Sequence, residues 1–279
     1  MSLSLEGKVA VITGGARGQG RAHAVALASA GADVALLDCV TDLPTVPYRL
    51  AASSDLDQTR QLVEETGRRC RTHVVDVRDG AGVQRVVDAV VDEWGHVDIA
   101  LANAGILSWG LLEEMPDAVW DEMIQVNLSG VFCLFRAVGP IMRMQRSGRI
   151  VATSSMAGRT GCALIGHYAA AKWGVIGLAK SFALEMAPHG VTVNVVAPVA
   201  VDTEMVNNAE SVHLYVPDRP GATRADVAAV LADKTAMNVP WIDAADVTAA
   251  VMYLVSEGAR YVTGEVLHIG AGRSAWNAV

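Results

Sequence analysis

Tyr168, Lys172 and Ser155 are the residues in this sequence whose types and spacing best suit chemistry. Tyr168 and Lys172 stand four residues apart in His-Tyr-Ala-Ala-Ala-Lys, so on a helix both side chains project from one face, about one turn apart. Ser155 precedes Tyr168 by thirteen residues and follows the apolar run 149–153. A lone Tyr-x-x-x-Lys pair is an ordinary helix pair, so its interpretation depends on the motifs around it.

These three side chains could move a proton to or from an alcohol. A phenol with its reference pKa of about 10 is a poor base at neutral pH, and a nearby ammonium lowers that pKa. With Lys172 supplying the charge, Tyr168 would take the hydroxyl proton while hydride leaves the carbinol carbon for a nicotinamide. Ser155 would hydrogen-bond the developing alkoxide, and Lys172 could also bind the nicotinamide ribose. The pattern predicts interconversion of a secondary alcohol and a ketone.

A glycine-rich turn near the N-terminus predicts a dinucleotide site. Thr13 to Gly20 read Thr-Gly-Gly-Ala-Arg-Gly-Gln-Gly, directly after an apolar run and before a helical pattern that begins near Arg21. Glycines here permit a tight turn and close approach of the backbone to a pyrophosphate at the helix N-terminus. Such a loop alone is weak evidence, and its place between strand and helix strengthens it. The expected cofactor contacts are Gly14, Ala16, Arg17, Gly18, Gln19 and Gly20.

Asp38, which closes the second apolar run, favours NAD over NADP. A carboxylate there accepts hydrogen bonds from both ribose hydroxyls and repels a 2′-phosphate. Arg17 is the competing signal, but Cys39 stands where an NADP enzyme would be expected to carry arginine. Asp38 could also be no more than a polar residue at a strand end. Cys39, Tyr168 and Lys172 are also expected to contact the cofactor. Further contacts are expected at the ends of the third and fourth runs: Asp76, Val77, Asn103, Ala104 and Gly105.

Seven short apolar runs alternate with helical patterns, which predicts one α/β domain over residues 1–279. Near-continuous apolar runs are typical of parallel strands covered on both faces. We therefore expect a Rossmann-type, doubly wound, seven-stranded parallel sheet with helices on both faces. The expected strands are 8–13, 33–38, 71–76, 97–102, 149–153, 191–196 and 265–269, and the clearest helical patterns are 18–30, 79–94, 119–146, 167–187 and 245–256.

Two stretches interrupt this alternation. The segment from about 39 to 57 contains Pro44, Pro47 and Tyr48, and lies where it could reach the cofactor. The segment from about 203 to 241, with a helix expected near 223–235, could cover the substrate. An apolar, adaptable pocket suits a terpenoid or alicyclic alcohol, although each residue could instead pack at a subunit interface. Its candidate lining residues are Met156, Leu164, Met205, Val206, Leu214, Tyr215, Met237, Val239 and Trp241.

Charge and cysteine content exclude several other classes. The net charge is −8, and the basic residues are scattered, which argues against nucleic-acid or anionic-membrane partners. The four cysteines are widely spaced, with no histidine at metal-ligand spacing, so neither a metal site nor a disulfide framework is expected. The N-terminal residues do not read as a signal peptide, and the apolar stretch 131–142 is broken by Arg136. A cytoplasmic protein is expected.

The sequence resembles the classical short-chain dehydrogenase/reductase family from about residue 5 to residue 272. The glycine motif at 13–20, Asn-Ala-Gly at 103–105, Asn127 in Val-Asn-Leu, and Ser155, Tyr168 and Lys172 occur in that family's order. The resemblance implies that Asn127 completes a catalytic tetrad, on a distorted helix that holds a water linking Lys172 to solvent. It also implies a homotetramer or dimer, assembled through long helices and the final strand.

Some positions depart from the family's pattern. Ala102 replaces the first Asn of Asn-Asn-Ala-Gly, and Pro198 is followed by Val199 where Pro-Gly is common, so the turn beside the nicotinamide could differ. The resemblance places Pro198, Val201 and Thr203 beside the nicotinamide, with Thr203 at a position that often contacts its carboxamide.

The insertion at about 39–57, with its Thr-Val-Pro-Tyr sequence, resembles the mycofactocin-coupled or carveol-dehydrogenase-like subgroup. That resemblance implies that the insertion covers NAD, which is held tightly and reoxidised in place by a redox carrier. Three alternatives stay open. A 3-oxoacyl-carrier-protein-type reductase is disfavoured by Asp38, and a non-catalytic dinucleotide-binding protein would have no reason to keep Ser155, Tyr168 and Lys172 together. An epimerase or dehydratase usually carries a larger C-terminal substrate domain.

Overall fold

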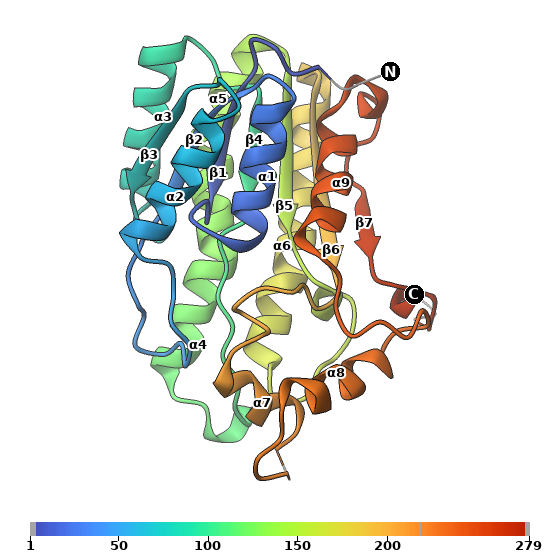
Figure 1. Cartoon of the computed structure of the whole chain (residues 1–279). Helices are drawn as coiled ribbons and strands as arrows, with labels where there is room; N and C mark the ends of the chain where they lie inside the picture. The colour runs from blue at the N-terminus through green and yellow to red at the C-terminus, as the bar shows by residue number, and fades with distance from the viewer. Residues whose placement is uncertain (1–3, 218, 277–279) are drawn as a thin grey trace.

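The computed structural model describes residues 4–217 and 219–276, and it contains one parallel seven-stranded sheet (Figure 1). Residues 1–3, part of the N-terminal stretch considered above, and 277–279 lie outside the described residues. The strand order is β3-β2-β1-β4-β5-β6-β7. The strands are β1 (Val9–Thr13), β2 (Asp33–Asp38), β3 (Cys70–Val74), β4 (Ile99–Ala102), β5 (Gly148–Thr153), β6 (Val191–Pro198) and β7 (Val266–Ile269).

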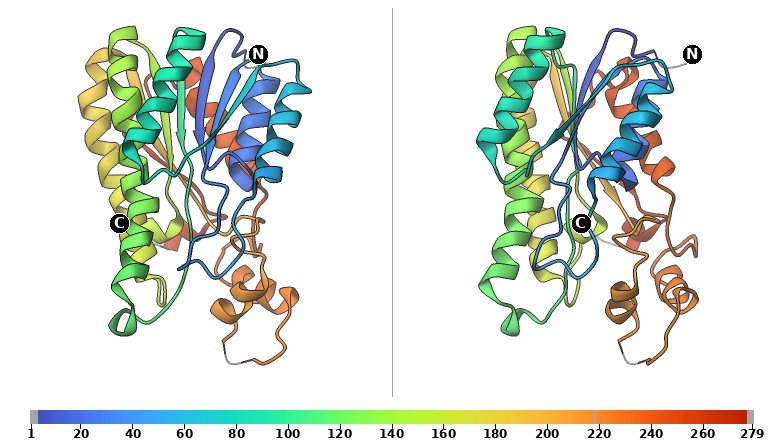
Figure 2. Two further views of the ribbon diagram at one scale, coloured as in Figure 1. Left: turned by 90° about the vertical axis from the view of Figure 1, so that its left-hand side faces the viewer. Right: turned by 60° about the vertical axis from the view of Figure 1, so that its left-hand side comes forward.

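Helices cover both faces of the sheet (Figure 2). One face carries α1 (Gly18–Ser29), α2 (Ser53–Glu64) and α9 (Ala244–Val255). The other carries α3 (Gly80–Trp94), α5 (Gly130–Gln145) and α6 (Gly166–Met186). The first three strands run outward from β1, and the chain then returns to place β4 on the other side of β1. This reversal opens a crevice at the carboxyl ends of β1 and β4, where such sheets bind their ligands.

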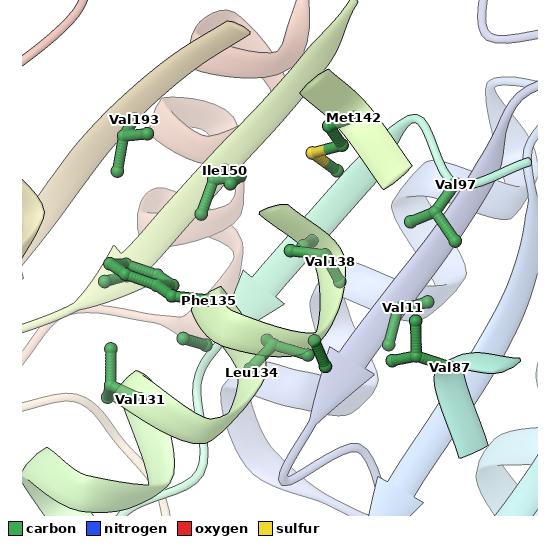
Figure 3. Packing of buried hydrophobic residues seen from close by; sticks show 14 of the residues in the cluster. Val11, Val87, Val97, Val131, Leu134, Phe135, Val138, Met142, Ile150 and Val193 are labelled. Atoms are coloured by element: carbon green, nitrogen blue, oxygen red, sulfur yellow. The ribbon is translucent and has the colours of Figure 1, made fainter. Parts of the chain in front are cut away.

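Two apolar cores, one on each face of the sheet, join the sheet to the helices that cover it. Both faces of the strands are therefore buried. Figure 3 shows Val11 and Ile150 of the sheet beneath Leu134, Phe135 and Val138 of α5. The burial of each strand on both faces explains why the strands read as continuous apolar runs rather than as alternating ones.

The segment Asp117–Gln145 is helical throughout and has the length and hydropathy of a membrane span. More than half of its most apolar window is buried inside the molecule, where α5 packs on the sheet and against α3 and α6. Its apolar character is therefore that of a core helix.

The structure confirms the α/β class, the seven strands and the two helical layers, corrects one boundary and adds one helix. The helix α2 begins at Ser53, inside the segment 39–57 that was expected to be irregular, so the irregular part is 39–52. The segment 203–241 contains α7 (Ala209–Tyr215) as well as α8 (Arg224–Ala232). Both short helices lie beyond the carboxyl ends of the strands (Figure 1).

Candidate active site

Two adjoining cavities open at the carboxyl ends of the strands. The first, of about 390 Å³, lies between the glycine-rich turn and residues 39–52, and the second, of about 470 Å³, contains Ser155 and Tyr168. They meet at residues that line both: Gln19, Asn103, Gly105, Thr203 and Met205. A two-part molecule such as a dinucleotide could therefore span them.

The helix α6 and the strand β5 bring Tyr168, Lys172 and Ser155 together. Lys172 is 3% exposed, and its Nζ lies 5.6 Å from the centroid of the Tyr168 ring. The same Nζ donates to the carbonyl of Thr153 at 2.9 Å. Ser155 follows β5 in extended backbone, and its hydroxyl hydrogen-bonds the Tyr168 phenol. The Ser155 hydroxyl, the Tyr168 phenol and the Lys172 ammonium therefore lie close together at the wall of the second cavity.

Burial sets the pKa values of this trio. It raises the pKa of the Tyr168 phenol well above its ordinary value, and the hydrogen bond from Ser155 opposes that rise. It lowers the pKa of Lys172 to about 8. Both shifts favour the neutral forms, so the charge of a bound oxidised nicotinamide would be needed to make Tyr168 an effective base.

Asn127 lies behind the trio, in a one-turn π-helix at Gln125–Ser129 between α4 (Asp117–Ile124) and α5. Its amide exchanges hydrogen bonds with the backbone of Ile106, accepting at 3.2 Å and donating at 3.1 Å. A Cβ on Gly105 would lie 2.8 Å from Asn127 Oδ1 and 3.5 Å from Lys172 Nζ. The turn after β4 can therefore pass close to both side chains only with glycine. The helix distortion that the family resemblance implies is present.

The first cavity has features that fit a dinucleotide. The helix α1 begins there without a side-chain cap, which leaves its first N–H groups available to a pyrophosphate. Gly18 has φ +55° and faces Thr203. A Cβ on Gly14 would lie 2.7 Å from the backbone of Ala104. Gln19 Oε1 is buried without a partner among the described residues, as expected of a polar atom that awaits a ligand.

Asp38 and Cys39 line this cavity together with Asp76 and Val77. Asp38 Oδ2 accepts from the N–H of Ala16 at 3.1 Å, and this bond fixes the carboxylate at the mouth of the glycine-rich turn. Burial raises the pKa of Asp38, and backbone N–H groups and the charge of Arg17 oppose the rise. Asp76 is paired with Arg78 at 2.6 Å.

Residues 39–52 form one wall of the first cavity. Tyr48 is 7% exposed, and its hydroxyl accepts from the N–H of Leu107 at 3.0 Å. Arg17 donates to the carbonyl of Arg49 at 2.7 Å and also pairs with Glu204. The insertion is thus tied to the start of α1 and, through Arg17, to the segment after β6.

Most of the predicted site residues reach the cavity walls. Among those expected to contact the cofactor, Ala16 and Gly20 do not line either cavity. Ala16 donates its N–H to Asp38, and a Cβ on Gly20 would come within 2.0 Å of the Gly14 carbonyl oxygen. Both residues therefore maintain the conformation of the glycine-rich turn and do not face the cavity. Pro198, Val201 and Thr203 line the second cavity.

The predicted substrate lining is right in part. Met156, Leu164, Met205, Val206, Leu214 and Tyr215 line the second cavity. Met237, Val239 and Trp241 do not: Met237 is exposed to solvent, and Trp241 stacks against Arg224. The sequence analysis missed Glu204, Lys234 and Arg273. Isolated charged residues outside the regular strands and long helices carry no periodic or motif signal.

The comparisons with known proteins agree with this geometry. The family model of short chain dehydrogenases matches residues 8–213. The (−)-trans-carveol dehydrogenase of Rhodococcus erythropolis is 44% identical over 270 residues, which cover 96% of this chain and 98% of the relative. The crystal structure of carveol dehydrogenase from Mycobacterium avium in complex with NAD matches with a TM-score of 0.95 and 41% identity, over 97% of this chain and 99% of that one.

A second kind of relative matches at lower identity. The 3-oxoacyl-[acyl-carrier-protein] reductase of Salmonella typhimurium is 36% identical over 270 residues, which cover 97% of this chain and 98% of the relative. The family resemblance drawn from the motifs, including the likeness to carveol dehydrogenases, is confirmed.

Proposed function

The chain belongs to the short-chain dehydrogenase family and is an NAD-dependent oxidoreductase; we propose that it interconverts a hydrophobic secondary alcohol, of terpenoid or alicyclic type, and its ketone. The observation that carries this proposal is the convergence of Ser155, Tyr168 and Lys172 on a cavity that is continuous with the dinucleotide cavity. Relatives named for carveol support the substrate class.

Each residue of the site has a proposed role. When bound, NAD supplies the acceptor for the hydride that leaves the carbinol carbon. Tyr168 takes the hydroxyl proton, Ser155 holds the substrate oxygen by a hydrogen bond, and Lys172 stabilises the Tyr168 phenolate by its charge. Asn127 keeps the π-helix beside Lys172 in place, and we propose that a water there connects Lys172 to solvent. In ketone reduction Tyr168 returns the proton.

The cofactor contacts follow from the same geometry. The glycine-rich turn with Arg17 and Gln19 would hold the pyrophosphate, and Asp38 would hold the adenosine ribose. Asp76 and Val77 would border the adenine. Near the nicotinamide we place the remaining predicted contacts: Asn103, Ala104, Gly105, Tyr168, Lys172, Pro198, Val201 and Thr203.

We further propose that residues 39–52 retain NAD between turnovers, and that a redox carrier of the mycofactocin type reoxidises it in place. The hydrogen bonds of Tyr48 with Leu107 and of Arg17 with Arg49 support retention, because they would have to break before the cofactor leaves. A cytoplasmic homotetramer is the form that we propose for the enzyme. Exposed apolar side chains on α5 and α6 support its assembly: Phe132, Met144, Trp173 and Leu184.

Reduction of a 3-oxoacyl thioester is the second candidate function, supported by the reductase at 36% identity. Asp38 disfavours it if such a reductase uses NADP, because a carboxylate at the ribose repels a 2′-phosphate.

Oxidation of a panel of alicyclic and terpenoid alcohols tests the proposal. The protein is purified without added nucleotide and denatured, and any released nucleotide is identified by mass spectrometry. Retained NAD directs the assay to a reducible dye as acceptor, and an empty site directs it to added NAD. Oxidation of carveol or a related alcohol in either assay supports the proposal. Reduction of a 3-oxoacyl thioester with NADPH, without any alcohol oxidation, would contradict it.

A further inference from the structure

Two positive side chains, Lys234 and Arg273, line the same cavity as Tyr168 and Ser155. Lys234 follows α8, and Arg273 begins the short helix Arg273–Trp276. The Nζ of Lys234 lies 5.7 Å from the centroid of the Tyr215 ring. Tyr215 in turn is near enough to Tyr168 to raise the pKa of its phenol. Lys234 and Arg273 are therefore part of the wall of the cavity that would hold the substrate.

The fold holds these cations together. The N–H of Met237 donates to the carbonyl of Ala271 at 3.1 Å. A Cβ on Gly272 would come within 2.6 Å of the Ala236 Cβ, so the turn after α8 and the turn before Arg273 are in close contact. Burial and then the charge of Arg273 lower the pKa of Lys234. Two like charges are held near each other although they repel.

No carboxylate among the described residues compensates them. The cavity wall contains Lys172, Lys234 and Arg273 but no aspartate or glutamate. Neither Lys234 nor Arg273 has an ion-pair partner within the described chain, whereas most of the arginines do. This is unexpected in a protein with net charge −8. Lys234 is exposed and Arg273 is half-buried, so both charges can pair with an anion that enters the cavity.

We propose that the cavity binds an alcohol whose apolar ring also carries a carboxylate, with the hydroxyl at Tyr168 and Ser155 and the carboxylate at Lys234 and Arg273. This inference rests on the proposed function and narrows its substrate class to hydroxy acids. Leu164, Met205 and Leu214 line the same cavity and provide the apolar contact for the ring. A cavity of about 470 Å³ is of the size that holds one small ligand.

Calorimetric binding to the NAD-loaded protein tests the proposal without requiring turnover. The probes are cyclohexanecarboxylate and cyclohexanecarboxamide, which have the same shape and differ in charge. We expect the carboxylate to bind at least tenfold more tightly than the amide. Lys234→Met and Arg273→Met should each remove about tenfold of the carboxylate affinity, the range of a charge-assisted hydrogen bond, and leave amide binding within twofold.

Arg85→Met is the matched control, because it removes one positive charge from an exposed pair with Asp79 outside both cavities. It should change neither affinity. Equal binding of the two probes, or no binding of either, would overturn the proposal. Weaker binding of 3-hydroxybutyryl coenzyme A in the two variants, with carboxylate binding intact, would assign the cations to a phosphate and also overturn it.

The failure of the proposed function has a different signature. In that case no alcohol, neutral or carboxylate-bearing, is oxidised in a reaction that depends on Tyr168, whatever the two carboxyl probes do. If the inference alone fails, neutral alcohols are oxidised in a reaction that depends on Tyr168, and the wild type and Lys234→Met turn over 4-hydroxycyclohexanecarboxylate at the same rate. Turnover of 4-hydroxycyclohexanecarboxylate and its carboxamide then gives a second readout of the same preference.

Discussion

Tyr168 lies in surroundings that oppose its ionisation, and the neighbouring residues are arranged to offset this. Burial raises the pKa of its phenol, and the hydrogen bond from Ser155 acts in the opposite direction. Lys172 Nζ is 5.6 Å from the ring centroid and is held there by the carbonyl of Thr153. A base that needs the charge of an oxidised cofactor to ionise would remain protonated until that cofactor is bound. This couples proton removal to hydride transfer.

Asp38 and Cys39 should decide the choice of cofactor. Replacing Asp38→Ser together with Cys39→Arg removes the carboxylate that would bind the ribose and adds a cation for a 2′-phosphate. We expect the preference in binding affinity for NAD over NADP to fall at least a hundredfold, because the variant loses the carboxylate that would bind the ribose and gains a cation for the 2′-phosphate. Equilibrium titration of the nucleotide-free protein with both cofactors measures this. Cys39→Arg alone is the control and should give a smaller shift; an unchanged preference in the double variant would contradict the role of Asp38.

At the scale of the elements, residues 39–52 are attached to the site by a few specific contacts. Tyr48 inserts into a small apolar cluster with Leu43, Leu50 and Met123. Burial raises the pKa of Tyr48 to about 12, so its hydroxyl stays neutral and accepts from the N–H of Leu107. The insertion is therefore a packed part of the cavity wall.

Tyr48→Phe should loosen this wall. The change leaves the buried N–H of Leu107 without its acceptor, which costs about 1 to 3 kcal/mol. We expect a lower free energy of unfolding in urea and faster release of bound NAD, measured by trapping the released cofactor. Tyr253→Phe, at an exposed tyrosine, is the control. Unchanged stability and release in Tyr48→Phe would show that the insertion does not depend on this bond.

A second element contact, between α1 and α9, predicts a pH dependence of stability. His23 is buried, its Nδ1 lies 2.7 Å from Thr248 Oγ1, and burial lowers its pKa from 6.5 to about 4. Below pH 6.5 the unfolded chain binds a proton that the folded chain does not. The free energy of unfolding should therefore fall by up to about 3 kcal/mol as the pH drops from 6.5 to 4.

His23→Gln should reduce this loss, because glutamine can bond Thr248 and does not titrate. Urea unfolding at several pH values between 4 and 7 measures the slope, and His213→Gln, at an exposed histidine, is the control. The same slope in His23→Gln as in the wild type would rule out His23 as its source.

The sequence predicted the elements better than the loops that join them. Continuous apolar runs gave the strands, and Tyr168, Lys172 and Ser155 were placed together because their spacing follows from helix and sheet geometry. The start of α2 at Ser53 was missed because the preceding prolines suggested a longer irregular stretch. Lys234 and Arg273 come together through contacts between distant turns, which no local pattern encodes.

At the scale of the whole molecule, the outer surfaces of α5 and α6 carry large apolar side chains. Phe132 is 45% exposed and Trp173 is 51% exposed, on two helices that are in contact with each other. Exposed apolar patches on a folded chain commonly mark contact surfaces between subunits. This agrees with the proposed homotetramer.

Trp173→Glu should weaken that assembly. A carboxylate would be placed in an apolar interface, where its burial is unfavourable. We expect sedimentation velocity to show a tetramer for the wild type and smaller species for the variant, with circular dichroism unchanged. Met237→Glu, at an exposed methionine outside these helices, is the control. A wild-type monomer, or an intact tetramer in Trp173→Glu, would contradict the assignment of this surface.

The central claim is that Tyr168 moves the proton in NAD-dependent alcohol oxidation. The most direct test is a single-turnover measurement with enzyme-bound NAD, comparing the wild type with Tyr168→Phe while reduced nicotinamide is followed by its absorbance. The account predicts that the variant binds NAD with unchanged affinity and oxidises the alcohol at least a hundredfold more slowly. The wild-type rate should rise with pH as the Tyr168 phenol ionises, and the residual rate of the variant should not. A variant that keeps the full rate would contradict the account.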